Sequence, residues 1–150
     1  MEVKTQLRGD QDTIEVSSEQ IYAFDPPLGG FEQLRRFVLI ADDGDSPVEW
    51  LQSVEDESVA FALLEPFLFD PNYAFELPDR DAEDLGMQGP EDAFVRCILT
   101  LRDDPGQITA NLLAPLVFCR RTHMARQLVL QDSGFALRHP VFSAMGRAAA

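Results

Sequence analysis

The sequence has few of the residues on which metal centres and redox sites are built. Its 150 residues include only two cysteines and two histidines. Cys97 and Cys119 show no metal or redox spacing, and both fall in apolar segments, where a buried, reduced thiol is the usual role. His123 and His139 stand beside basic residues without a matched ligand, so we expect surface roles for both. The sequence therefore predicts no metal and no cofactor.

Motifs for nucleophilic and phosphate chemistry are missing as well. Ser53 lacks the flanking glycines of a nucleophile elbow, and no GK[ST] follows Gly29-Gly30. Residues 79–90 begin like a calcium loop, but Asp84 stands where that loop needs glycine and Pro90 where it needs glutamate. We predict that the protein is not an enzyme.

Long apolar runs are also absent. The longest, residues 112–119, is far too short to cross a bilayer and is interrupted by Pro115. The first five residues show no apolar core of a signal peptide. We therefore expect a cytoplasmic protein that does not enter a membrane.

Positive charge is scarce, with 12 basic against 26 acidic side chains and a net charge of −14. Residues 41–92 carry sixteen acidic side chains against Arg80 alone, whereas residues 93–150 carry seven basic and three acidic ones. This composition argues against binding nucleic acid or anionic membranes, because both need Lys and Arg. A basic protein is the natural electrostatic partner, although acidity alone is explained equally well by solubility. We predict a one-sided acidic face formed by residues 41–92.

What the sequence does contain is a series of short apolar segments separated by turn residues, a spacing typical of β-sandwiches and barrels. Residues 3–7 and 14–16 predict an opening hairpin that turns at Gly9-Asp10. Further strands are predicted, in order, at 21–24, 37–41, 50–54, 59–64, 93–101, 108–119 and 126–130. We predict a mainly β protein, a small single-domain antiparallel β-barrel-like fold over residues 1–142, with a frayed tail at 143–150.

Three local features follow from the turn and strand chemistry. Pro105-Gly106 predicts a type II turn, and Pro115 predicts an edge position or a bulge. One face of the strand at 93–101 is expected to carry its alternating apolar side chains, namely Val95, Cys97, Leu99 and Leu101.

One short helix is predicted near residues 79–86. Asp79 is expected to cap it, and Gly86 to end it. Further acidic residues suit the positive N-terminal end of a helix, namely Asp81, Glu83 and Asp84.

Aromatic residues gather in an acidic segment that prolines interrupt, comprising Phe67, Phe69, Tyr73 and Phe75. About half of them are expected to fill the core, and the others to anchor a binding patch with an acidic rim. The candidate partner-binding residues are Phe67, Phe69, Tyr73, Asp79, Asp81, Glu83 and Asp84.

Several of these segments are similar to those of a known family. The sequence WLQSV at residues 50–54 and LEPFLFDPNY at residues 64–73 resemble the W-L-Q-S and P-x-x-F-x-P-x-Y signatures of the bacterial flagellar assembly factor FliW. Further matches follow in the same order along the chain, at residues 30–32, 109–117, 127–130 and 138–140. The loop PPLGG at residues 26–30 departs from the more usual E-G-I-P-G.

The resemblance implies a small β-barrel-like fold without catalytic residues or cofactor. It implies a cytoplasmic protein that binds flagellin and the translational repressor CsrA, a small RNA-binding dimer. Once flagellin is exported, the freed factor would capture CsrA and relieve repression of flagellin synthesis. An acidic chain would be steered to basic CsrA, whereas flagellin would lay an amphipathic terminal helix in an apolar groove that includes Phe67, Phe69 and Tyr73. We expect a monomer when the protein is free.

Two alternatives stay open at this point. The first alternative is an acidic export chaperone for flagellin without a regulatory role, which predicts binding of flagellin alone. The second is an enzyme with a carboxylate pair, which predicts that substituting Asp81, Glu83 and Asp84 abolishes turnover and spares protein binding.

Overall fold

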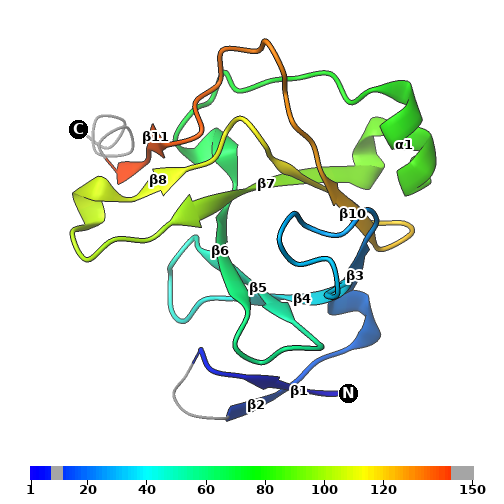
Figure 1. Cartoon of the computed structure of the whole chain (residues 1–150), viewed down its shortest axis with the longest axis vertical. Helices are drawn as coiled ribbons and strands as arrows, with labels where there is room; N and C mark the ends of the chain where they lie inside the picture. The colour runs from blue at the N-terminus through cyan, green and yellow to red at the C-terminus, as the bar shows by residue number, and fades with distance from the viewer. Residues whose placement is uncertain (8–11, 143–150) are drawn as a thin grey trace.

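The computed structural model describes residues 1–7 and 12–142 of the chain (Figure 1). The predicted turn at Gly9-Asp10 and the predicted tail at 143–150 lie outside these residues. The strands are β1 (Glu2–Thr5), β2 (Asp12–Glu15), β3 (Ile21–Phe24), β4 (Arg36–Ala41), β5 (Glu49–Ser53), β6 (Ala60–Leu64), β7 (Ala93–Thr100), β8 (Thr109–Ala110), β9 (Leu116–Cys119), β10 (Met124–Gln127) and β11 (His139–Pro140). The α-helix is α1 (Asp79–Leu85), and short 3₁₀ turns span Ser18–Gln20, Pro66–Leu68, Pro90–Asp92 and Pro105–Gln107.

Seven of these strands close into a barrel, in the order β7-β6-β5-β4-β3-β10-β9 (Figure 1). The barrel closes where β9 pairs with β7, with Phe94 opposite Phe118. Neighbours in the barrel are antiparallel except β3 and β10, whose parallel pairing joins Ala23 to Met124. The short strands β8 and β11 extend the far end of β7. For the part of the chain that the structure describes, the predicted mainly β, barrel-like fold with one short helix is therefore confirmed.

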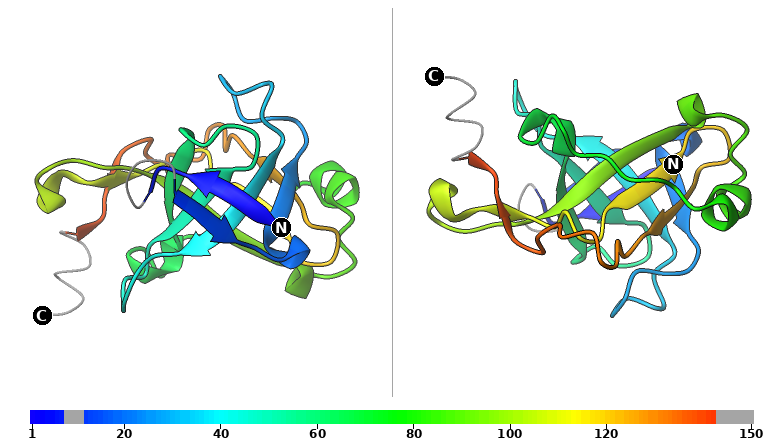
Figure 2. Two further views of the ribbon diagram at one scale, coloured as in Figure 1. Left: turned by 90° about the horizontal axis from the view of Figure 1, so that it is seen from below. Right: turned by 90° about the horizontal axis from the view of Figure 1, so that it is seen from above.

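Parts of the barrel wall are buried on both faces, because other elements cover their outer side. The interior holds an apolar cluster that includes Phe24, Phe37 and Phe118. Outside, the hairpin β1–β2 and helix α1 lie against different sides of the barrel (Figure 2). The hairpin buries Val3 and the helix buries Leu85 against the wall. Strands buried on both faces read as continuous apolar runs, which explains why 37–41 and 62–64 show little alternation.

Three local predictions are wrong, each for a physical reason. The strand predicted at 108–119 is two strands, because the chain turns where Asn111 Oδ1 accepts the Ala114 N–H (2.9 Å), and Pro115 lies in that break. Residues Pro105–Gln107 form a 3₁₀ turn capped by Asp104, and Gly106 lacks the positive φ of a type II turn. Leu101 lies beyond the end of β7 and is 50% exposed, unlike Cys97 and Leu99.

Candidate protein-binding site

An apolar groove lies between the segment that follows β6 and the outer face of β7. Its volume is about 290 Å³, and it is lined by Phe67, Tyr73, Ala74, Phe75, Leu77, Ala93, Val95 and Val117. A second hollow of about 230 Å³ continues it toward α1 and is lined by Leu77, Ala82, Met87, Gly89, Pro90 and Ala93. Because Leu77 and Ala93 line both, the two hollows form one apolar surface, which we call the β7 groove.

The groove exists because β6 ends early. β6 pairs with β7 through only two residue pairs, and after Leu64 the chain turns away at Pro66–Leu68. Among the strands of residues 1–7 and 12–142, the first half of β7 therefore has a neighbour, β9, on one side only. The Ala93 carbonyl accepts from Arg120 (3.1 Å) and the Val95 carbonyl from Arg96 (2.9 Å). Arginine side chains thus cover part of an edge that would otherwise pair with another strand.

The predicted aromatic anchors differ in exposure. Phe67 is 42% exposed and lines the β7 groove, whereas Tyr73 is 2% exposed and lies at its floor. The Tyr73 hydroxyl donates to the Leu112 carbonyl (2.7 Å), and burial raises its pKa. Phe69 is also buried, packs beside His139 and does not line the groove. Phe67 and Tyr73 therefore line one apolar groove and Phe69 lies outside it, while a partner-binding role for these residues stays a prediction.

The acidic helix is confirmed at Asp79–Leu85, with a different N-terminus from the one predicted. Pro78 occupies the N-cap position and Asp79 is the first helical residue, so the prediction that Asp79 caps the helix is wrong. As a first-turn carboxylate, Asp79 still lies next to the positive end of the helix dipole. Gly86 ends the helix with φ 77°, as predicted.

Two of the candidate acids are already paired within the protein. Arg126, on β10, donates to Asp81 (2.8 Å) and to Asp84 (3.1 Å), and its side chain is 13% exposed. Burial opposes its charge, but the hydrogen bonds that it donates to the two carboxylates, together with their negative charges, outweigh burial and raise the pKa of Arg126. Asp79 and Glu83 are exposed.

Acidic residues of the middle of the chain form ion pairs with arginines that follow them in the sequence. Besides Arg126, Arg96 pairs with Glu49 (2.5 Å), and Arg121 approaches Asp92 to 3.9 Å. The predicted one-sided acidic face is therefore wrong for the surface around α1, where arginines from the C-terminal third lie among the acids. The sequence could not show these ion pairs, because they join segments that are far apart along the chain and meet only in the folded barrel.

The histidines are more enclosed than predicted. His123 stacks on Tyr22 with ring centroids 5.1 Å apart, and its Nδ1 lies 3.2 Å from the Ile21 carbonyl. His139 lies in β11 beside Phe69. Both are half-buried, so each lies at the surface with one side of its ring packed against an aromatic side chain. In residues 1–7 and 12–142, no group of three or more His, Cys, Asp or Glu side chains is arranged to hold a metal ion.

The cysteines are buried and reduced, as predicted. The Cys97 thiol donates to the Leu64 carbonyl (3.2 Å), and burial raises its pKa to about 12. Within the described part of the chain, no helix has the length and apolar character needed to span a membrane.

The closed barrel with an apolar groove on its outer side places the chain in the class of small β-barrel proteins. The family model described as FliW protein matches residues 5–141, and the chain belongs to the FliW family. Members of this family are named as assembly factors and are not enzymes, which excludes the carboxylate-pair alternative.

Individual relatives agree with this assignment. The chain is 42% identical over 130 residues to the flagellar assembly factor FliW of Bdellovibrio bacteriovorus, covering 87% of this chain and 74% of that protein. It is 40% identical over 126 residues to that of Bacillus subtilis, covering 84% and 88%. A crystal structure of a flagellar assembly factor FliW superposes with a TM-score of 0.84 at 31% identity, covering 93% of this chain and 96% of that one.

Proposed function

We propose that this flagellar assembly factor binds two proteins in the cytoplasm, flagellin and the translational regulator CsrA. While flagellin is abundant, it occupies the protein. Once flagellin is exported, the freed protein captures CsrA and relieves repression of flagellin synthesis. The observation that carries the proposal is the open β7 groove on a chain of the FliW family.

The β7 groove suits an amphipathic helix. Such a helix buries a few apolar side chains in a groove and keeps its polar face in water. Phe67 offers an exposed aromatic contact at the groove, and Tyr73 and Leu77 supply an apolar floor and wall. The flanking exposed acids, Glu76 and Glu91, favour a helix with Lys or Arg beside its apolar stripe.

Charge complementarity supports the second partner. A protein that binds RNA needs a basic surface, and a chain of net charge −14 attracts it over long distances. Asp79 and Glu83 support this proposal because their carboxylates are exposed, whereas Asp81 and Asp84 already pair with Arg126.

The test is co-elution and titration calorimetry of the purified protein with flagellin and with CsrA from the same organism. We expect both to bind, and added flagellin to release bound CsrA. Binding of flagellin alone would replace the regulatory role with that of an export chaperone. Binding of neither would overturn the proposal.

A further inference from the structure

Helix α1 forms one wall of the β7 groove but is too short to be stable by itself. It has seven residues, and isolated helices shorter than about 12–15 residues are marginal in water. Ala82 on α1 and Met87 just after it line the groove. The position of this wall must therefore be fixed by contacts with the barrel.

One set of contacts holds the C-terminal end of α1. The Thr122 hydroxyl donates to the Leu85 carbonyl (2.6 Å), and the Arg121 guanidinium donates to the Gly86 carbonyl. Both donors come from the turn between β9 and β10. They satisfy carbonyls that a helix end leaves without a partner, and the positive charge of Arg121 suits the negative end of the dipole.

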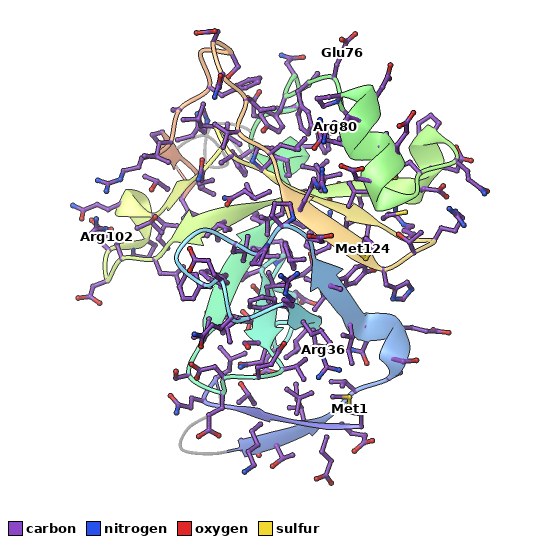
Figure 3. All side chains as sticks on the ribbon, turned by 45° about the vertical axis from the view of Figure 1, so that its right-hand side comes forward. Met1, Arg36, Glu76, Arg80, Arg102 and Met124 are labelled. Atoms are coloured by element: carbon purple, nitrogen blue, oxygen red, sulfur yellow. The ribbon has the colours of Figure 1, made fainter. Side chains whose placement is uncertain are left out.

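Arg126 holds the other side of the helix. Its Nη1 donates to Asp81 and Asp84, and its Nε and Nη2 donate to the Asp25 carbonyl at 3.1 and 2.8 Å. One side chain thus joins α1 to β10 and to the loop after β3. Figure 3 shows Arg80 on the same helix, and this exposed residue makes no ion pair with any residue in the described ranges.

We propose that Arg126 is a positioning residue for partner binding: it fixes α1, and with it the Ala82 and Met87 wall, at the width that accepts flagellin's amphipathic helix. The inference rests on the proposed function for the identity of that occupant. The planar guanidinium directs donors toward the two carboxylates and the carbonyl at once. A lysine offers a single charged centre and cannot reproduce both directions.

The experiment compares Arg126→Gln, Arg126→Lys and the matched control Arg80→Gln with the wild type. Hydrogen exchange is measured on the free proteins, and flagellin affinity is measured by calorimetry. For Arg126→Gln we expect faster exchange confined to residues 79–87 and about tenfold weaker flagellin binding. Arg126→Lys should be intermediate, and Arg80→Gln should match the wild type.

Each part of the result decides something different. Failure of the wild type to bind flagellin would overturn the proposed function, while the exchange data would still report on the position of α1. If Arg126→Gln leaves hydrogen exchange unchanged but weakens flagellin binding, Arg126 contacts flagellin directly. If it speeds exchange but leaves flagellin affinity unchanged, the position of the Ala82 and Met87 wall does not affect binding. Either result overturns the positioning role. If Arg126→Gln does not fold, the hydrogen exchange and the flagellin affinity of Arg126→Lys are compared with those of the wild type instead.

Discussion

The hydroxyl of Thr5 donates a 2.6 Å hydrogen bond to Oε1 of Gln52, which lies 47 positions further along the chain. Both side chains are almost completely buried. The Nε2 of Gln52 lies 3.1–3.2 Å from the carbonyl oxygens of Ser53, Glu57 and Val59. The glutamine of the W-L-Q-S segment therefore joins the β1–β2 hairpin to the turn between β5 and β6, and its role is structural.

Replacing Gln52 with Leu should destabilise the protein by about 2–3 kcal/mol, because buried polar groups in both elements lose their partner. Thr5→Val should cost less, and the double variant should cost less than the two single costs combined. Urea denaturation of the four proteins measures these differences. Strict additivity would show that the two side chains do not interact.

Gly86→Ala should be among the costliest single-methyl additions in the chain. Gly86 has φ +77°, and an added Cβ would lie 2.6 Å from Thr122 Cγ2. Gly44 has a similar φ of +70° with no atom within 4 Å of an added Cβ. We expect a loss of about 1 kcal/mol for Gly44→Ala, from backbone strain alone, and about 2–3 kcal/mol or more for Gly86→Ala. Equal losses in thermal denaturation would contradict the close packing of α1 on the turn after β9.

Stability should fall at high pH through Cys97. Its folded pKa is raised from 9.0 to about 12, so the neutral thiol of the folded state contributes stability that is complete below pH 9. That contribution is lost as the pH rises from 9 toward 12, by about 1 kcal/mol at pH 10. Denaturation of the wild type at pH 8 and pH 10 should show this loss, and Cys97→Ala should show a smaller one. The same pH dependence in both proteins would refute the assignment.

Association with CsrA should depend on salt and on the exposed carboxylates of α1. Raising the salt from low to physiological concentration should slow association markedly, because exposed charges are screened beyond about 8 Å. Asp79→Asn with Glu83→Gln should also slow it, whereas Glu2→Gln, on the distant β1–β2 hairpin, should not (Figure 1). Stopped-flow kinetics measure both effects. A rate that does not respond to salt would indicate an apolar interface instead.

Most strands could be predicted because their signals are local. Apolar runs bounded by turn residues mark β3, β4, β5 and β6, and Gly86 marks the end of α1 without any tertiary information. Barrel closure could not be predicted in the same way. The parallel contact of β3 with β10 joins Ala23 to Met124, and nothing local in either segment specifies it.

The candidate site was predictable in composition but not in exposure. Phe67, Phe69 and Tyr73 lie within seven residues and look alike in sequence, yet only Phe67 is exposed. Their exposure depends on what packs over them, and for Tyr73 that includes Phe135, which comes from a distant part of the chain. The pairing of Arg126 with Asp81 and Asp84 was missed for the same reason, since charge counts along a sequence do not report neighbours across a barrel.

The central claim is that this protein binds flagellin through the β7 groove, and the affinity of Phe67→Ala for flagellin tests it most directly. Leu101→Ala is the matched control, because Leu101 is also exposed, at 50%, and does not line the groove. We predict that Phe67→Ala binds flagellin about tenfold more weakly or worse, as is typical of a central aromatic anchor, while Leu101→Ala binds as the wild type does. Equal affinities for Phe67→Ala and the wild type in calorimetry would contradict the account.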